Sequence, residues 1–231
     1  EPMSGAAYIL AINLSVAGLL AATFLAIAFH DRARTPARWF TAAYALGMAN
    51  AAVEIGIAIF GSSLAVVILS FAVLLAAMAL LGVGLADKYR VPVPWRLLAT
   101  IFLASILVCA AIQPMPRGSA LRMLFYQAPY FAMQAIAAWI VWRAPARRRV
   151  DAALAGLLAV SALQFLAKPA LMRLAGGTGA SAHAYADTSY ALISQTMGSV
   201  FAVAVALAIL AILVRDLLAE VTAKSQTDPL S

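Results

Sequence analysis

Hydrophobic residues gather in seven long stretches along the chain, and short segments rich in glycine, proline, serine or charge separate them. The stretches cover residues 6–29, 37–60, 64–86, 95–112, 120–142, 150–174 and 185–218. A helix needs about 20 apolar residues to cross the hydrocarbon core of a bilayer. The pattern therefore predicts an all-α integral membrane protein, a bundle of seven transmembrane helices.

The composition agrees with this pattern. Of the 231 residues, 65% are hydrophobic and 11% are charged, whereas a soluble domain is roughly half apolar and a quarter charged. The net charge of +7 arises between the hydrophobic stretches, where basic residues act as topology signals. We therefore expect no nucleic-acid partner.

The distribution of lysine and arginine predicts the orientation. Twelve of the sixteen cations lie in the first, third and fifth connections and the C-terminal tail, and Lys168 lies inside the sixth stretch. The opposite side carries Arg117, Arg122 and Arg173. Because positive residues accumulate on the cytoplasmic side, we expect the N-terminus outside and the C-terminus in the cytoplasm.

Few residues suggest chemistry of a known kind. Cys109 is the single cysteine, which excludes an intrachain disulfide and a cysteine metal cluster. His30 and His183 fall on opposite sides of the predicted membrane, too far apart to share a haem. A retinal Schiff base is expected on the last helix, whereas Lys168 is on the sixth. We predict no catalytic residue, no metal site and no cofactor in this chain.

The seventh stretch predicts a helix that leaves the membrane. Proline is absent from Ser189 until Pro229, so this segment can form one helix of about 35 residues, on the order of 50 Å long. Such a helix is longer than the hydrocarbon core of a bilayer, which is about 30 Å thick. In its last turns Val214, Leu217, Val221 and Lys224 follow one another at steps of three, four and three. This spacing is typical of a coiled-coil seam, and it fits an unpaired amphipathic end equally well.

The C-terminal residues carry a resemblance. Thr227-Asp228-Pro229-Leu230-Ser231 resembles the entry to a GGDEF domain, which an Asp-x-Leu-Thr stretch opens, with Ser231 in place of threonine. The seven-stretch part is similar to the membrane sensor parts of bacterial diguanylate cyclases. The resemblance implies a sensor domain over residues 1–214, a cytoplasmic helical linker over 215–226, and the start of a truncated GGDEF-like domain over 227–231.

The same resemblance implies a bacterial inner-membrane location and a homodimer. The parent protein would condense two GTP, with Mg, into cyclic di-GMP when two GGDEF domains meet. The residues for that reaction are not in these 231 residues, so whether this chain belongs to an enzyme stays open. Asp228 serves only as a boundary marker.

Two ionisable residues lie inside predicted spans, where charged groups are costly and often functional. Glu54 and Lys168 both fall in the outer half when counted at about 1.5 Å per residue, so the two side chains can meet. In one interpretation Lys168 binds an anionic head group and Glu54 sets the local charge. In the other they form a structural ion pair, or Lys168 reaches the headgroups.

Further polar side chains fall at similar depth. Pro129 and Pro169 interrupt two helices and free backbone carbonyls. We expect one outer-half pocket between the fifth, sixth and seventh helices, and the remaining candidates for it are Tyr126, Gln127, Tyr130, Gln134, Tyr190 and Gln195. Hydrogen bonds between helices explain each of them singly as well.

The predicted function is a transmembrane sensory input module. It detects a small or lipidic ligand, membrane lipid being one candidate, and regulates a cytoplasmic diguanylate cyclase through the seventh helix. A small multi-span transporter or channel is the alternative, because the same polar groups could line a transport path. An intramembrane enzyme is disfavoured because no nucleophile and base pair is evident.

Overall fold

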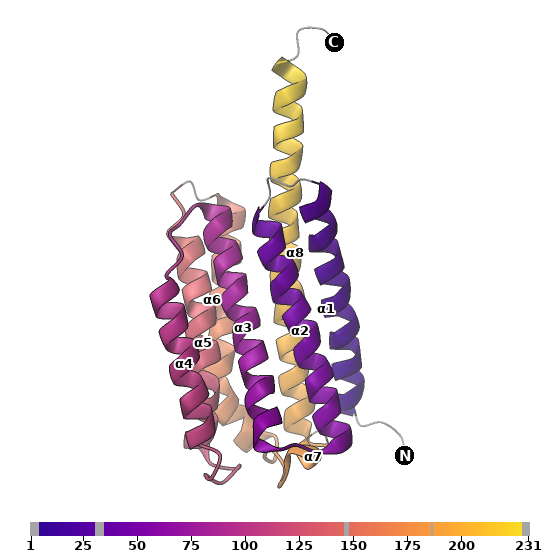
Figure 1. Cartoon of the computed structure of the whole chain (residues 1–231), viewed down its shortest axis with the longest axis vertical. Coiled ribbons are helices and arrows are strands. Elements are labelled where there is room, and N and C mark those ends of the chain that lie inside the picture. The colour runs from indigo at the N-terminus through magenta and orange to yellow at the C-terminus, as the bar shows by residue number, and fades with distance from the viewer. Residues whose placement is uncertain (1–4, 31–34, 146–147, 186, 228–231) are drawn as a thin grey trace.

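The computed structural model describes residues 5–30, 35–145, 148–185 and 187–227. Over these residues it is all-helical and contains no strand, which confirms the all-α part of the prediction. The helices are α1 (Gly5–His30), α2 (Thr35–Phe60), α3 (Leu64–Tyr89), α4 (Trp95–Ala111), α5 (Ala120–Trp142), α6 (Arg149–Leu174), α7 (Ala182–Tyr185) and α8 (Ser189–Thr227) (Figure 1).

The long helices follow the seven hydrophobic stretches closely. α7 is an addition: a single turn of four residues is too short to show a helical period. It displaces the start of the last helix from residue 185 to Ser189. That helix, α8, is 39 residues long and projects well beyond its neighbours (Figure 1).

Short polar segments set the helix ends. Ser63 and Ser119 precede α3 and α5, and each side-chain oxygen accepts a hydrogen bond of 3.4 Å from the backbone N–H three residues on. Asp151 accepts one of 2.8 Å from the backbone N–H of Arg148. These side chains satisfy backbone donors that a helix start leaves free.

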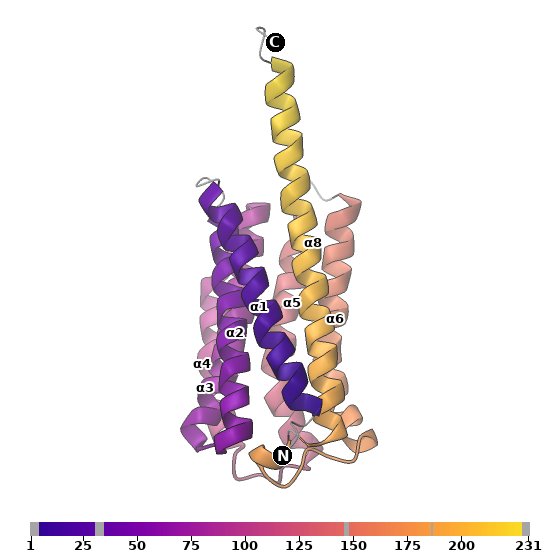
Figure 2. The ribbon, with the colours of Figure 1, turned by 90° about the vertical axis from the view of Figure 1, so that its right-hand side faces the viewer.

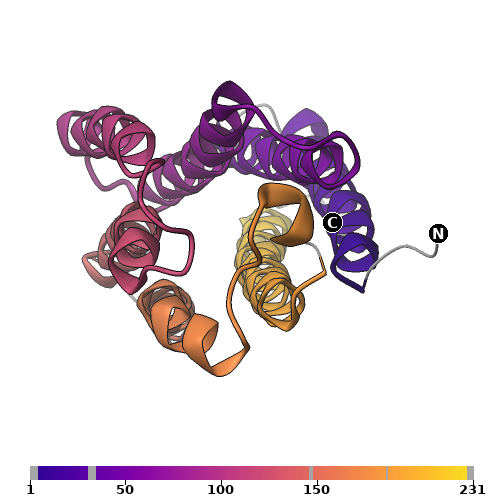
Figure 3. The same ribbon diagram turned by 90° about the horizontal axis from the view of Figure 1, so that it is seen from below.

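Six helices form a closed ring. Each packs against the next in the order α1, α2, α3, α5, α6 and α8, and α8 returns to α1. α4 lies outside this ring, against α3 and α5 (Figure 3). Consecutive long helices run in opposite directions (Figure 1). We call the end from which α8 projects the tail end, and the opposite end the α7 end.

The structure is that of a multi-pass membrane protein. Among the described residues, five helices are long and apolar enough to cross a membrane: α1, α2, α3, α6 and α8. α4 is apolar but has only 17 residues. α5 has 23 residues but includes Arg122, Gln127 and Gln134, which lower its hydropathy. Seven spans and their orientation stay predictions.

The half of the bundle next to the tail end is densely packed. Phe24 is fully buried and its ring lies 5.4 Å, centroid to centroid, from Phe40 and from Tyr44. Gly84 on α3 makes room for this group, because a Cβ atom there would lie 2.6 Å from the Phe40 ring. Ile140, Leu158 and further apolar residues of α5, α6 and α8 complete the core.

Charged side chains tie α8 to the bundle where it leaves the tail end. Asp216 of α8 accepts hydrogen bonds from Lys88 at the end of α3 and, at 2.9 Å, from Arg215. Its carboxylate also lies 3.7 Å from Arg148, which precedes α6. We call Asp216 with these three cations the exit cluster.

Candidate functional site

A cavity of about 810 Å³ lies inside the ring, and its polar lining is on the α7 side of the packed core. Side chains from α1, α2, α3, α5, α6, α7 and α8 line it. All eight predicted ligand-binding residues line this one cavity: Glu54, Lys168, Tyr126, Gln127, Tyr130, Gln134, Tyr190 and Gln195. The sequence-based estimate of depth therefore grouped side chains that the fold brings together.

The cavity is wider than the sequence suggested. The expected pocket lay between the fifth, sixth and seventh helices, whereas α1, α2 and α3 also contribute to the wall that is found. The reason is ring closure, since α8 packs against both α6 and α1. Sequence periodicity does not reveal which helices are neighbours.

Glu54 and Lys168 line the cavity without pairing. Glu54 bonds to the hydroxyl of Ser70, which also lies 3.1 Å from the Asn50 amide oxygen. The ammonium of Lys168 lies 4.8 Å from the centre of the Phe165 ring, a cation–π contact. No ion pair within 4.0 Å joins Glu54 to Lys168 in the described part of the chain. Of the interpretations that the sequence left open for these two charges, the structural ion pair is therefore not found among the described residues.

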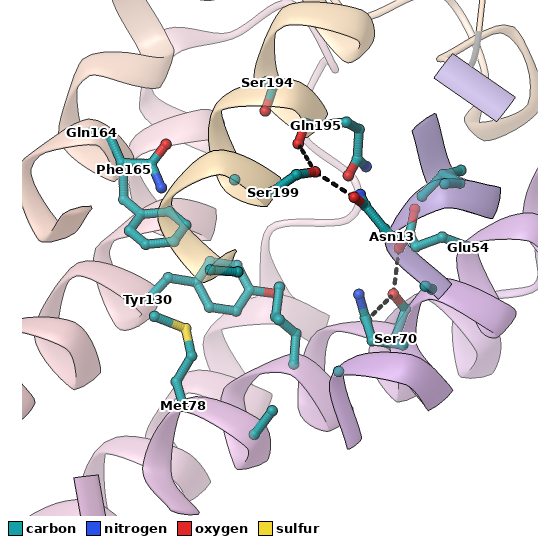
Figure 4. A pocket seen from close by; sticks show the side chains of 18 of the residues that line it. Asn13, Glu54, Ser70, Met78, Tyr130, Gln164, Phe165, Ser194, Gln195 and Ser199 are labelled. Carbon is teal, nitrogen blue, oxygen red and sulfur yellow. Dashed lines mark hydrogen bonds between the residues drawn. The ribbon is translucent and has the colours of Figure 1, made fainter. Parts of the chain in front are cut away.

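A second polar group joins α1 to α8. The hydroxyl of Ser199 bonds to the Asn13 side-chain oxygen and lies 2.7 Å from the backbone carbonyl of Gln195 (Figure 4). Ser194 lies one turn away on α8 and is buried. None of Asn13, Ser194 and Ser199 was among the eight predicted ligand-binding residues. A serine in a helix often bonds only its own backbone, so Ser199 gives no signal in the sequence.

The opposite wall is aromatic and apolar. Met78, Tyr130 and Phe165 face the polar groups of α1 and α2 across the space drawn in Figure 4. The ring centres of Tyr130 and Phe165 are 5.6 Å apart. Deeper in the same wall, the Gln134 amide donates a hydrogen bond of 3.1 Å to Ser161.

Two buried amides have an oxygen without a partner among the described residues. Gln127 and Gln164 are 5% and 6% exposed, and neither side-chain oxygen has a hydrogen-bond partner in that part of the chain. A buried acceptor without a donor is costly, so these oxygens are suited to a donor from a ligand or water. Gln164 was missed, although it precedes Lys168 by four residues and so shares its helix face.

Arginines line the cavity at the α7 end. The Arg122 guanidinium donates to the Met115 carbonyl at 2.5 Å and to the Gln113 side chain at 3.0 Å. The Nε atom of Arg117 is buried, and it has no hydrogen-bond partner within the part of the chain that the structure describes. Burial, and then the neighbouring Arg122 guanidinium, lower the pKa of Arg117. In the sequence, both arginines served only as topology signals.

Tyr185 of α7 also lines this end of the cavity. Gly179 holds the preceding turn at a φ of +74°, and a Cβ atom there would lie 2.9 Å from the Ala184 carbonyl oxygen. A side chain at residue 179 would therefore displace α7. The short helix is a built part of the cavity wall.

The predicted signal linker is on the projecting part of α8. Val214 and Val221 are exposed, as is Leu218, whereas Leu217 is half-buried. The Lys224 side chain and residues 228–231, on which the GGDEF resemblance largely rests, lie outside the described residues.

Two further findings bear on the chemistry of the cavity. Within the described residues, no group of three or more His, Cys, Asp or Glu side chains could hold a metal ion. Comparison with known protein families, with curated proteins and with solved structures finds no match for this chain. What the cavity could bind must therefore be argued from its own residues.

Proposed function

We propose that this chain is a transmembrane sensory input module: a ligand in the cavity changes how α8 packs, and α8 passes that change to a cytoplasmic diguanylate cyclase. One observation carries the proposal. α8 is a single helix that lines the cavity with Ser194, Gln195 and Ser199 and then continues past the bundle (Figure 2). A rigid helix shared by a cavity and a projecting segment is suited to connect the two.

The contacts of α8 suggest how a ligand could act. In the cavity half, α8 is held by Ser199 on Asn13 and by a 2.9 Å hydrogen bond from the Tyr44 hydroxyl to the Ala202 carbonyl. A ligand that competes for these polar partners favours a different packing of α8. It shifts the equilibrium only as far as it binds the two packings unequally.

The charge distribution supports the proposed orientation, with seven spans and the tail end in the bacterial cytoplasm. Cations of the tail-end connections and of α8 include Lys88, Arg90, Arg143, Arg148 and Arg215. They lie on the side from which α8 projects, as the positive-inside tendency requires.

We propose that two copies pair along the projecting part of α8. Val214, Leu218 and Val221 are 47%, 61% and 57% exposed, and their steps of four and three place them on one helix face. Leu218 thus joins the seam in place of the half-buried Leu217. Pairing would bring two attached GGDEF domains together.

Cysteine cross-linking in native membranes tests the pairing. We expect Val214→Cys and Val221→Cys to give cross-linked dimers, and the matched control Ile212→Cys, 2% exposed and facing the bundle, to give none. Equal cross-linking at all three positions, or none at any, contradicts a dimer seam on α8.

The coding sequence past Ser231 tests the output. We expect Gly-Leu-x-Asn-Arg followed by a Gly-Gly-(Asp/Glu)-Glu-Phe loop. A stop codon, or an unrelated domain, removes the diguanylate cyclase from the proposal and leaves the cavity and α8 to be explained otherwise.

A small transporter is the second candidate, because Glu54 and Lys168 line a cavity between membrane helices. A transporter moves its solute into proteoliposomes and does so equally well after deletion of residues 219–231. A sensor shows no such flux. The dense core at the tail end argues against an open channel, since Phe24, Phe40 and Leu158 are fully buried there.

A further inference from the structure

The charged lining of the cavity is predominantly positive. Arg117, Arg122 and Lys168 line it, and among the described lining residues Glu54 alone is acidic. None of the three cations has a described carboxylate within 4.0 Å. Because a charge removed from water needs a partner, this lining favours an anionic ligand over a cationic one.

The two arginines provide a place for the acidic group. Arg122 uses part of its donor fork on Met115 and Gln113, whereas the buried Nε–H of Arg117 has no acceptor among the described residues. Both arginines line the same cavity, and the Arg122 guanidinium is held on the Met115 carbonyl, two residues before Arg117 in the chain. In agreement with this placement, the charge of Arg122 helps to lower the pKa of Arg117. Carboxylates and phosphates match the guanidinium fork, so an acidic group that bridges both arginines would satisfy the free donor and reduce their repulsion.

Beyond the arginines much of the wall is hydrocarbon. Leu74 and Met78 from α3, Phe165 from α6 and Val203 from α8 line the same cavity. Covering such a surface with an apolar group lowers the free energy, because apolar surface is then removed from water. A small inorganic anion would leave it uncovered, whereas the hydrocarbon chain of an amphiphile would cover it.

The cavity also reaches the outer surface of the ring through apolar residues. The lining residues that are largely exposed are Ile12, Val200, Ala202 and Leu207, all on α1 or α8. α1 touches α8 near the α7 end and leans away from it toward the tail end (Figure 2). A hydrocarbon chain can thus enter sideways, without leaving the bilayer.

From these observations we infer that the cavity binds an anionic amphiphile, with its acidic head between Arg117 and Arg122 and its hydrocarbon chain along Met78, Phe165 and Val203. The inference rests on the proposed function, for which it names the class of ligand. Gln127, whose buried oxygen has no donor in the described part of the chain, is suited to a hydroxyl or a protonated acidic group of such a head.

The test compares four probes with one chain length: dodecanoate, dodecyl phosphate, dodecanol and dodecylamine. Each competes with a fluorescent fatty acid for the protein in phosphatidylcholine nanodiscs, with empty nanodiscs subtracted. We expect one or both anions to bind at least about tenfold more tightly than dodecanol, and dodecylamine to bind weakest. The ratio of dodecanoate to dodecyl phosphate distinguishes a fatty-acid source from a phospholipid source.

Arginine variants assign the head site. Arg117→Gln and Arg122→Gln should each lower the affinity for the preferred anion about tenfold and leave that for dodecanol unchanged. The matched control Arg173→Gln removes an exposed cation at the same end of the bundle that does not line the cavity, and should change neither. Thermal unfolding of each variant shows whether it is folded.

Equal binding of dodecanol and both anions overturns the inference, as does a loss of affinity in Arg173→Gln equal to that in the two cavity variants. The α8 cross-links separate this result from failure of the proposed function. If the anions bind but the Val214→Cys and Val221→Cys cross-links do not respond, the ligand class stands and the sensory role fails. If another compound changes the cross-links while the anions do not bind, the sensory role stands and the inferred ligand class fails.

Discussion

The two halves of the bundle are built from the same helices but differ in how their interior is filled. Next to the tail end, aromatic and branched side chains fill the ring, and the exit cluster around Asp216 fastens α8. Toward the α7 end, the ring is hollow and carries Glu54, Lys168 and the polar groups of α1, α5 and α8. The difference suggests that the dense half keeps α8 aligned, while the hollow half lets a ligand change the contacts of α8.

Each long helix takes part in both halves. α2 places Phe40 in the core and, about four turns further along, Glu54 in the cavity. α5 places Ile140 in the core and Gln127 in the cavity. Buried apolar groups need close packing and buried polar groups need partners, so one helix can present a rigid end and an adaptable end.

The largest contrast is expected from one substitution made in both halves. Gly84→Ala should destabilise the protein by about 1–3 kcal/mol, because the new methyl group meets the fully buried Phe40 ring. Gly47→Ala should stabilise it by about 0.5–1 kcal/mol, because residue 47 is helical and lines the cavity with nothing within 4 Å of the added atom. Thermal unfolding in nanodiscs measures the stability of both variants. Shifts of the same sign would contradict the contrast between a dense half and a hollow half.

A pair of glutamines gives the next largest difference. Gln134→Leu should cost about 1–2 kcal/mol, since it removes the bond to Ser161 and leaves a buried hydroxyl unpaired. Gln164→Leu should be neutral or stabilising by up to about 1 kcal/mol, because it removes an oxygen that has no partner. Unfolding of the ligand-free protein distinguishes the two, and an equal loss would mean that Gln164 is held by a contact such as an ordered water.

The exit cluster allows a smaller and more local test. Asp216→Asn leaves Lys88, Arg148 and Arg215 without their common carboxylate, so hydrogen exchange along residues 210–223 should speed up. The global stability should fall by about 1 kcal/mol or less, because these groups are partly exposed to solvent. Asp187→Asn, an exposed carboxylate at the α7 end, is the control and should leave this exchange unchanged. Unaltered exchange in Asp216→Asn would show that core packing alone fixes α8.

The smallest effect is expected at Glu54. Glu54→Gln keeps an oxygen that can accept from Ser70 but removes the acidic charge from the cavity. Dodecanoate should then bind about threefold more tightly, the size expected for one screened charge. Competition in nanodiscs measures this change, and weaker binding would mean that Glu54 contacts the ligand directly.

Much of the architecture could be predicted from the chain alone. The first six hydrophobic stretches match α1 to α6 to within three residues at each end. The last stretch, 185–218, corresponds to α8 (Ser189–Thr227), and the proline-free run after Ser189 predicted its projection. Both are local properties of 20 to 40 consecutive residues. α7 was missed because a single turn has no period to detect.

The sequence predicted which side chains share the candidate site, from their level along the helices, but it did not predict which of them contact one another. The eight chosen side chains share one cavity because helices of similar length place polar residues of similar depth at one level. Glu54 nevertheless contacts Ser70 and not Lys168, and Arg117 and Arg122 line the cavity although they were counted only as topology signals.

The sequence by itself determined the all-helical class, most boundaries of the long helices and the level of each polar residue along its helix, because apolar length and residue spacing are local quantities. The tertiary structure decided the rest: the ring order, the position of α4 outside it, the hollow half, and which polar atoms are left without partners. Those features depend on contacts between helices far apart in the chain. Close packing of particular side chains, such as Phe40 against Gly84, selects those contacts.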